Sequence, residues 1–315
     1  MPNIPHSLPA GTRLDNYIIR KPLGGGGFSV VYLADEMETG RPTAIKEYMP
    51  GKLAVRGDDL AVRARDSSVQ DRFQRGRNLF FQEASTLAAL RHPNIVEVRT
   101  FFNANGTVYM AMAYEEGKNL QHYISRRKGR LSERFLLTVF PPLLDALHLI
   151  HEQGFLHLDI KPGNIHVRPG GSPLLLDFGA VHCRRESRQQ QLGQVTSAGF
   201  SPIEQYNRTG YIGPWTDIYA IGASMRTCIE GRPPVDARER NSRDAMRPAS
   251  QAYRRQYSAP LLEAMDWAME VDPLLRPQNV ADLVGALPRL APAEDGDEEG
   301  TGLLERLAAM TRDRS

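Results

Sequence analysis

The chain of 315 residues carries a net charge of +2, and 41% of its residues are hydrophobic. This length allows a domain with a large buried core, and the small net charge gives no electrostatic reason to expect a nucleic acid or a membrane surface as a partner. The two cysteines, Cys183 and Cys228, predict neither a disulfide framework nor a zinc site.

The beginning of the chain does not have the pattern of a secreted or membrane-inserted protein. It lacks the basic region and the apolar core of a signal peptide, and no run in the chain approaches 18 apolar residues. We therefore expect a cytoplasmic protein without membrane insertion.

Residues 12–113 alternate between apolar and polar positions as β-strands do, around one helix. The segment Leu23–Val31 places four consecutive glycines between two predicted strands. Because glycine has no Cβ, backbone N–H groups in such a turn can approach phosphate groups closely. Most glycine-rich runs are ordinary turns, so this one indicates a nucleotide only together with other motifs. Ala44-Ile45-Lys46 follows in a further strand, and its Lys needs an acidic partner to hold it in place.

Glu83 is the acidic residue that we expect to pair with Lys46. It lies in a predicted helix whose apolar positions include Phe80, Leu87 and Leu90. An exposed charge on that helix is the alternative interpretation of Glu83.

The segment before this helix, residues 47–79, is long and interleaves arginines with aspartates. A solvated loop with an extension of the helix is one interpretation. The other is a docking or dimer surface that sets the position of Glu83. Ser68 and Asp71 have the spacing of a capping box, which predicts that the helix begins near Val69.

Farther along the chain the apolar pattern becomes helical. Ser132 is a predicted N-cap for a helix that ends near Gly154. Pro141 and Pro142 fall inside that span. Proline removes an N–H donor and clashes with the preceding turn, so we expect a kink or a restart there.

The residues that indicate a catalytic activity lie in two segments, His157–Asn164 and Asp177-Phe178-Gly179. Asp159 precedes Asn164 by five residues, and Asp177 follows Asn164 by thirteen. Transfer of a phosphoryl group needs a carboxylate at the nucleophile and oxygen ligands for the Mg²⁺ ions that bridge the phosphates. One such Asp alone would indicate a solvated surface charge, but both motifs in this order favour phosphoryl transfer.

These two motifs resemble the H-R-D-L-x-x-x-N and D-F-G runs of protein kinases, and the strand that ends at Lys46 resembles their V-A-I-K strand. From about Gly11 to Leu290 the chain is similar to this family. Within the family it resembles soluble bacterial eukaryotic-like (Hanks-type) serine/threonine kinases without a transmembrane sensor domain. The resemblance implies an α+β, two-lobed protein-kinase-like fold. Its parts would be an N-terminal extension at 1–11, a small β-rich N-lobe at about 12–113, a larger, mainly helical C-lobe at about 117–290, and an acidic linker with a short amphipathic segment at 291–315.

Carried over residue by residue, the resemblance implies four catalytic residues. Asp159 would orient the substrate hydroxyl, and Lys161 would neutralise charge on the moving phosphoryl group. Lys46 and Glu83 would form the ion pair that holds the α- and β-phosphates.

The same resemblance implies a metal site and a nucleotide site. Asn164 and Asp177 would hold Mg²⁺, with Mn²⁺ as an alternative metal. Met112 would be the gatekeeper of the ATP site, and the backbone of Ala113–Glu115 would pair with adenine. The implied nucleotide contacts are Leu23, Gly24, Gly25, Gly26, Val31, Ala44, Lys46, Met112, Ala113, Glu115 and Ile165.

The segment Ser197–Glu204 resembles the A-P-E segment of the family. The resemblance implies that Glu204 pairs with Arg276 and anchors the peptide-binding floor. It places Ser197 near the catalytic Asp and Lys. It also implies that Asp217 braces the backbone of the catalytic loop, although a helix N-cap is an ordinary structural role for that residue.

One departure concerns activation, because Leu158 replaces the Arg of H-R-D. In the family that Arg receives the phosphate of a phosphorylated loop, and Leu cannot. We therefore expect loop phosphorylation to alter activity only modestly, although we expect the protein to phosphorylate itself. The candidate acceptors are Thr196, Ser197, Ser201 and Ser187, with Thr196 first.

The function implied is ATP- and Mg²⁺-dependent phosphorylation of Ser or Thr hydroxyls of proteins, in bacterial signalling. Lys161, two residues after Asp159, is typical of the Ser/Thr type of catalytic loop. A pseudokinase scaffold, a small-molecule phosphotransferase of the same fold and a pure interaction module are the alternatives. The complete catalytic set disfavours the first, Glu204 with Arg276 disfavours the second, and only the C-terminal segment favours the third.

The partners implied are protein substrates with Ser or Thr acceptors. A cognate phosphatase and a second copy of the chain in a homodimer are further partners that the sequence leaves open. Neither a nucleic acid nor insertion into a membrane is expected.

Overall fold

The computed structural model describes residue 4 and residues 6–176, 182–183, 196–207 and 210–290. The chain is divided into two compact units. The N-terminal unit comprises Met1–His92 and Val96–Glu115, and the C-terminal unit comprises Pro93–Ile95 and Glu116–Ser315. The predicted metal ligand Asp177, the candidate acceptor Ser187 and the segment 291–315 lie outside the described residues.

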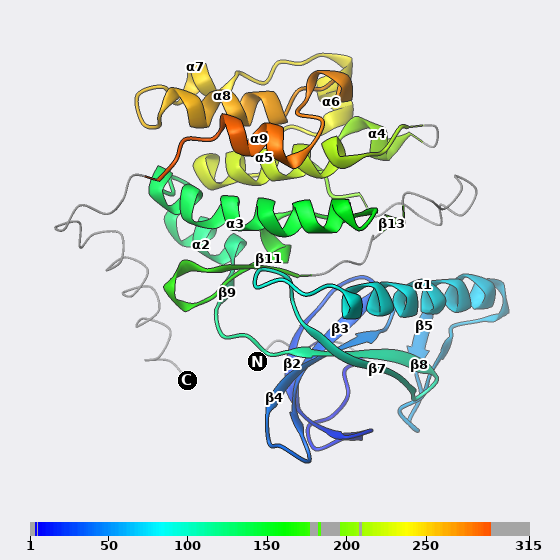
Figure 1. Cartoon of the computed structure of the whole chain (residues 1–315). Helices are drawn as coiled ribbons and strands as arrows, with labels where there is room; N and C mark the ends of the chain where they lie inside the picture. Colours follow the sequence, from blue (N-terminus) through cyan, green and yellow to red (C-terminus); the bar gives the residue numbers. More distant parts are fainter. Residues whose placement is uncertain (1–3, 5, 177–181, 184–195, 208–209, 291–315) are drawn as a thin grey trace. The chain divides into compact units, whose positions relative to one another are not determined.

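An antiparallel sheet of six strands and one long helix, α1 (Gln70–Ala89), make up most of the N-terminal unit (Figure 1). The strands, in their order across the sheet, are β1 (Arg13–Leu14), β2 (Tyr17–Gly25), β3 (Ser29–Glu36), β4 (Pro42–Tyr48), β8 (Thr107–Ala113) and β7 (Val98–Ala104). Along β2, buried Tyr17 and Ile19 flank exposed Ile18, because successive side chains of a strand point to opposite faces. The predicted strand pattern around one helix is confirmed.

The segment between β4 and α1 contains a second hairpin. Its strands are β5 (Ala54–Arg56) and β6 (Val62–Ala64), and a 3-10 turn, η1 (Ser67–Val69), leads into α1. The predicted helix start is correct to within one residue, but the predicted capping box is wrong. Asp66 accepts from Ser68 N (2.9 Å) and caps the 3-10 turn instead, while Val69, at the N-cap of α1, cannot cap with its side chain.

Helices dominate the C-terminal unit (Figure 1). In the part of this unit that the structure describes, the short strands form two small antiparallel sheets. One contains β12 (Pro173–Leu175), β11 (Ile165–Val167) and β9 (Lys118–Asn119), and the other contains β10 (Phe155–Leu156) and β13 (His182–Cys183). The helices and 3-10 turns are α2 (Leu120–Arg127), α3 (Glu133–Glu152), η2 (Pro162–Asn164), η3 (Pro169–Gly171), α4 (Ile203–Tyr206), α5 (Pro214–Glu230), α6 (Ala237–Ser242), α7 (Ala249–Ala252), α8 (Ala259–Ala268), η5 (Pro273–Leu275) and α9 (Val280–Ala286). A β-rich first unit followed by a mainly helical one confirms the α+β fold class.

The helix α3 begins and ends where the sequence predicts. Ser132 Oγ accepts from Phe135 N (3.2 Å), and Gly154, with φ +79°, follows the last turn. The break expected at Pro141 and Pro142 is wrong, since α3 is continuous through both. Eleven of its twenty residues are buried, so packing against the rest of the unit holds the helix despite the two missing N–H donors.

Within the described residues, α3 alone is long and apolar enough to meet the length and composition criteria of a membrane-spanning helix. Of the apolar window that meets them, 61% is buried inside the protein. The central helix of a folded core meets the same criteria, so this finding is weak evidence for a membrane span.

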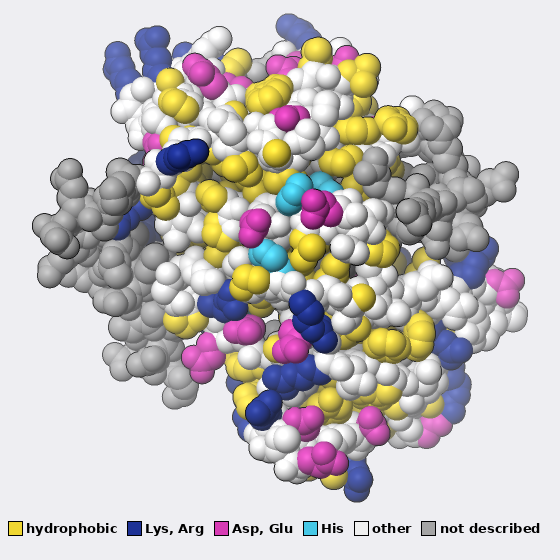
Figure 2. All heavy atoms as spheres, in the orientation of Figure 1, with side chains coloured by type: hydrophobic (Ala, Val, Ile, Leu, Met, Phe, Trp, Pro, Cys, Tyr) yellow, Lys and Arg dark blue, Asp and Glu magenta, His cyan; other side chains and the backbone are white. Residues whose placement is uncertain are grey.

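Charged side chains of both signs are interspersed over the N-terminal unit on the face that Figure 2 shows. This pattern agrees with the small net charge of the chain. That face of the unit therefore has no extended field of a single sign to attract a polyanion.

Candidate active site

Lys46 of β4 and Glu83 of α1 form a buried ion pair in the N-terminal unit. Lys46 Nζ is 3.0 Å from Glu83 Oε1, and both side chains are less than one-tenth exposed. Phe80 and Leu87, three residues before and four after Glu83, are buried as well, so this face of α1 carries Glu83 inward. The predicted pairing is confirmed, whereas its role in binding phosphates stays a prediction.

Four of the predicted nucleotide-binding residues lie on one face of the sheet. Val31 is paired with Lys46 across β3 and β4, and Ala44 is paired with Met112 across β4 and β8. Cross-strand partners project to the same side of a sheet, and Ala44 and Lys46 are two residues apart, so all four share that side. Ala113 follows Met112, and its N–H donates to Glu97 O (2.9 Å), so a contact of its backbone with adenine, which stays a prediction, would use the carbonyl group.

The glycine-rich turn between β2 and β3 leaves room above its backbone. Gly24 and Gly25 pair with Val31 and Val30, and Gly26 N donates to Ser29 O (2.8 Å). A Cβ added at Gly24 or Gly26 would meet no atom within 4 Å. The packing of the protein therefore does not require glycine at these two positions, whereas the close approach of a phosphate would.

The three remaining residues predicted to contact a nucleotide belong to two different units, and each is described within its unit. Leu23 lies on β2 and is more than one-third exposed, and Glu115 closes the N-terminal unit. Ile165 begins β11 in the C-terminal unit and is fully buried. Their contacts with a nucleotide stay predictions.

In the C-terminal unit, three side chains surround the carboxylate of Asp159. Lys161 Nζ lies 2.9 Å from Oδ1 and 2.8 Å from Oδ2. Asn164 Nδ2 donates to Oδ2 (2.9 Å), and Ser197 Oγ donates to Oδ1 (2.8 Å). Lys161 Nζ also donates to Ser197 Oγ (3.0 Å), which confirms the predicted position of Ser197.

This arrangement suits the orientation of a hydroxyl nucleophile. A carboxylate that accepts from one serine hydroxyl has the geometry to accept from another and to take its proton. Lys161 places a positive charge beside the same oxygen atoms, where negative charge on a transferred phosphoryl group would be stabilised.

The amide of Asn164 uses its nitrogen on Asp159 and leaves its oxygen for another contact. Its Nδ2 donates to both Asp159 O (2.9 Å) and Asp159 Oδ2 (2.9 Å), which identifies the nitrogen side of the amide. The oxygen side is therefore directed elsewhere, and amide oxygen is a ligand that Mg²⁺ accepts. Asn164 thus fits the predicted metal site, whereas the second predicted ligand, Asp177, lies outside the described residues.

The backbone of the catalytic loop is strained and held by Asp217. Leu158 is buried with φ +60°, a left-handed conformation that a branched side chain rarely adopts. Asp217 Oδ1 accepts from Leu158 N (2.7 Å), and Oδ2 accepts from His157 N (2.9 Å). The predicted brace is confirmed.

His151, which no sequence pattern distinguished, holds Asp217 from its other side. His151 Nε2 is 2.8 Å from Asp217 Oδ2, and both side chains are buried. Burial alone would raise the pKa of Asp217, but the hydrogen bond and charge of His151, together with His157, hold that pKa below its ordinary value. The ionised carboxylate of Asp217 therefore accepts hydrogen bonds from the backbone N–H groups of His157 and Leu158.

Gln205 makes a second contact with the loop His157–Asn164 that the sequence did not predict. It follows Glu204 directly, is buried, and donates from Nε2 to Leu158 O (2.9 Å). Asp217 and Gln205 thus hold the N–H and the C=O of Leu158, the residue before Asp159. Its position next to Glu204 was the one feature of the sequence that could have pointed to Gln205. The contact with Leu158 itself follows only from the folded chain.

Replacing Gln205 with Met should lower kcat by about tenfold and leave the KM for ATP nearly unchanged, because Leu158 O would lose its hydrogen-bond donor beside Asp159. Steady-state kinetics on a protein substrate measures both constants, and Gln251→Met, at an exposed position of α7, is the matched control. A kcat within about twofold of wild type would show that Asp217 alone holds the loop.

Glu204 and Arg276 form a buried ion pair, as the sequence predicts. Arg276 Nη1 donates to Glu204 Oε1 (2.7 Å) and Nη2 donates to Oε2 (3.2 Å). Thr216 Oγ1 also donates to Glu204 Oε1 (2.9 Å), and the Arg276 guanidinium lies 4.8 Å from the centroid of the Tyr219 ring. The bidentate pair therefore anchors the start of α4 within the unit.

Comparison with known families and structures agrees with this geometry. The family model for the protein kinase domain matches residues 17–286. The chain belongs to the protein kinase family. Among solved structures, it resembles the PpkA-294 apo form, with 38% sequence identity and a TM-score of 0.80, over 90% of this chain and 100% of that one.

Curated relatives of this kinase include plant and bacterial proteins. It is 30% identical over 237 residues to CBL-interacting protein kinase 21 of Oryza sativa subsp. japonica, covering 75% of this chain and 41% of that protein. It is also 30% identical over 220 residues to the serine/threonine-protein kinase PrkC of Bacillus subtilis (strain 168), covering 70% of this chain and 31% of PrkC. The chain thus spans less than half the length of these relatives.

Proposed function

We propose that this kinase is a bacterial eukaryotic-like serine/threonine kinase that transfers the γ-phosphoryl group of ATP to Ser or Thr hydroxyls of proteins, including its own. The observation that carries the proposal is the hydrogen bond from Ser197 Oγ to Asp159 Oδ1, with Lys161 Nζ on both groups. It is an intramolecular example of the contact that a substrate hydroxyl would make.

In the proposed reaction, the charged side chains of the candidate site have separate roles. The acceptor oxygen forms a bond to the γ-phosphorus, the bond from that phosphorus to ADP breaks, and the hydroxyl proton passes to Asp159. Lys161 neutralises the charge on the transferred group, and Lys46, held by Glu83, binds the α- and β-phosphates. Asn164 would be among the residues that hold Mg²⁺, which would supply positive charge to neutralise the phosphates.

Three features support a protein acceptor rather than a small molecule. Lys161 stands two residues after Asp159, the Ser/Thr type of loop, and Ser197 lies beside it. The Glu204–Arg276 pair anchors the segment that would form the floor for a peptide. We also propose a cytoplasmic location and partners limited to protein substrates, a cognate phosphatase and a second copy of the chain.

Incubation of the purified protein with labelled ATP and Mg²⁺ tests the proposal. We expect autophosphorylation between residues 180 and 204, with Thr196 as the first site because it is exposed. Ser201 is buried and its Oγ accepts from Ser197 N (3.0 Å), so it should be a poor acceptor in the folded protein. Mass spectrometry that finds no phosphate at all would favour a pseudokinase, and phosphate solely outside this segment would reject the predicted sites.

Treatment with a phosphatase should change the rate on an added protein substrate by less than about tenfold, roughly the effect of one hydrogen bond. The physical reason is that Leu158 offers no cation to a loop phosphate, while Asp217 and Gln205 hold its backbone without one. A loss of about a hundredfold or more would show that another basic residue receives the phosphate, with Arg184 and Arg185 as the candidates from the sequence.

A further inference from the structure

The hairpin of β5 and β6, in the long segment between β4 and α1, is attached to the sheet. Val62 N donates to Asn105 O (2.7 Å) at the turn between β7 and β8, whereas the bond from Arg65 N to Leu53 O (2.8 Å) lies within the segment itself. Gly106, with φ +71°, would place a Cβ 2.6 Å from Val62 O, so the two backbones approach as closely as glycine allows. The segment is therefore a docked element and not a solvated loop.

Glu47, next to Lys46 on β4, is the centre of a buried network that holds this hairpin. Its side chain is fully buried and accepts from three donors. Tyr32 Oη donates to Oε2 (2.7 Å), and Tyr109 Oη donates to Oε1 (2.5 Å). Arg56 Nη2 of β5 supplies the third bond, to Oε2 (2.5 Å). Burial and the charge of Glu47 raise the pKa of both tyrosines, so their hydroxyls stay protonated as donors.

The guanidinium of Arg56 joins three separate parts of the N-terminal unit. Besides the bond from Nη2 to Glu47, Nε donates to His6 O (2.8 Å) and Nη1 donates to Leu60 O (2.8 Å). Leu8 N donates to Tyr32 Oη (3.1 Å), which ties the same N-terminal segment to the network a second time. A planar cation with five donors is suited to such a three-way junction.

The residues of β4 on either side of Glu47 contact α1. Lys46 pairs with Glu83, and Tyr48 packs on the first half of the helix, with its ring centroid 5.7 Å from that of Phe73. A Cβ at Gly76 would lie 2.0 Å from Tyr48 Oη, so α1 lies directly on the tyrosine. Lys46 and Tyr48 share one side of the strand and Glu47 has the other, as the alternation of a strand requires.

We infer that Arg56 is a positioning residue for the Lys46–Glu83 pair. It fastens the hairpin and the N-terminal segment to Glu47, and the hairpin continues through η1 into α1, the helix that carries Glu83. The helix is thereby held at its start by the hairpin and along its face by Tyr48. The catalytic consequence rests on the proposed function, whereas the structural one does not.

Two variants test the inference. Arg56→Lys keeps the positive charge, but a single ammonium cannot reproduce the fork that reaches Glu47, His6 and Leu60. The double variant Arg56→Met with Glu47→Gln removes both charges and so avoids an unpaired buried carboxylate that could prevent folding. The control is Arg63→Lys, the same chemical change at an exposed arginine of β6 that pairs only with exposed Asp59 among the described ion pairs.

Hydrogen exchange is the readout that is independent of activity. In both Arg56 variants the amides of α1 should exchange about tenfold or more faster relative to those of β2 and β3. In Arg63→Lys the ratio between α1 and these strands should stay as in wild type, because Arg63 is exposed and contacts neither Glu47 nor α1 in the hydrogen bonds described. A merely structural role for Arg56 would speed exchange in α1 and in the strands together, and that result would overturn the inference.

Kinetics gives the second readout. If Glu83 is displaced, Lys46 is held less well, so kcat/KM for ATP should fall by about tenfold in the Arg56 variants and not in Arg63→Lys. An unchanged kcat/KM together with unchanged exchange of α1 would also overturn the inference. If the wild type itself transfers no phosphate, the proposed function fails, and the exchange of α1 still decides whether Arg56 positions the helix.

Discussion

Asp159→Asn should lower kcat by about 10²–10⁴-fold while the protein keeps its fold, since general-base and orienting effects of one carboxylate have this size. An amide cannot take the proton of the acceptor hydroxyl, and it removes the negative charge that holds Lys161 at 2.8 Å. Binding of ATP should change little, because the Lys46–Glu83 pair is formed within the N-terminal unit. Phosphate transfer to a protein substrate and the melting temperature are measured together.

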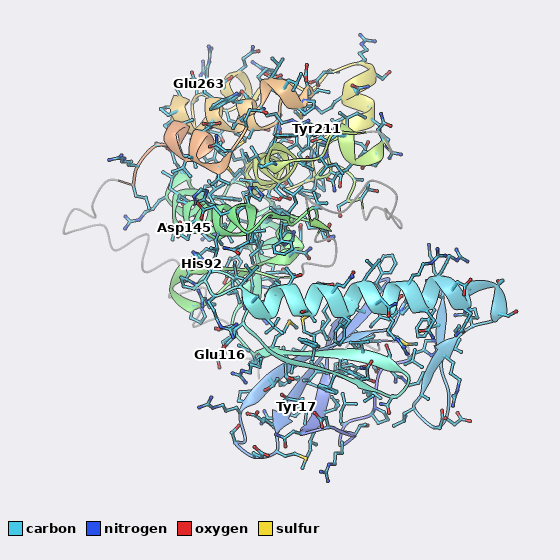
Figure 3. The ribbon with its side chains drawn as sticks, turned by 45° about the vertical axis from the view of Figure 1, so that its right-hand side comes forward. Tyr17, His92, Glu116, Asp145, Tyr211 and Glu263 are labelled. Atoms are coloured by element: carbon cyan, nitrogen blue, oxygen red, sulfur yellow. The ribbon has the colours of Figure 1, made fainter. Side chains whose placement is uncertain are left out.

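The control for this prediction is Asp145→Asn, the same chemical change at an exposed position of α3 (Figure 3). Its kcat should stay within about twofold of wild type, as expected for a surface carboxylate outside the site. Transfer at the wild-type rate by Asp159→Asn would mean that another residue orients the acceptor. A collapse of the melting temperature would assign Asp159 a structural role instead.

Arg276→Met should destabilise the C-terminal unit by about 3–5 kcal/mol, because it leaves the buried carboxylate of Glu204 without its cation. The same guanidinium donates to the carbonyl groups of Glu270 (2.6 Å), Val271 (2.9 Å) and Trp215 (3.3 Å), which would also lose their donor. Chemical denaturation monitored by the tryptophan fluorescence of the chain measures the loss.

A double-mutant cycle separates the pair from the rest of the site. Combining Arg276→Met with Glu204→Gln removes both charges, so the double variant should be more stable than Arg276→Met alone. Arg255→Met, at an exposed position, should change the free energy of unfolding by less than about 0.5 kcal/mol. Equal losses for Arg276→Met and Arg255→Met would show that the buried pair contributes little to stability.

The sequence alone predicted which residues of the loop His157–Asn164 belong to one site. Asp159, Lys161 and Asn164 lie within six residues, and the 3-10 turn η2 helps to bring their side chains together. Motif spacing also predicted two pairs that are distant in sequence, Lys46 with Glu83 and Glu204 with Arg276, because the resemblance to kinases supplied the tertiary structure that connects them.

Two predictions from local sequence patterns failed because another interaction outweighs the pattern. Pro141 and Pro142 predict an interrupted helix, but burial along α3 holds a continuous one. Ser68 and Asp71 have the spacing of a capping box, but Asp66 forms a 3-10 turn first and moves the start of α1. In both places the competing interaction comes from the folded unit or from a neighbouring residue that the pattern does not include.

The sequence by itself determined the kinase fold class, the order of the motifs and the choice of Asp159 as the candidate catalytic carboxylate, because these depend on spacing and on local chemistry. Only the tertiary structure decided that Gln205 holds Leu158 and that Arg56 joins the hairpin to Glu47. These contacts pair one side chain with a carbonyl or carboxylate that lies 47 or 9 residues away. A hydrogen bond of this kind leaves no periodic signal, because its direction is set by how the buried backbone folds and not by the residues between.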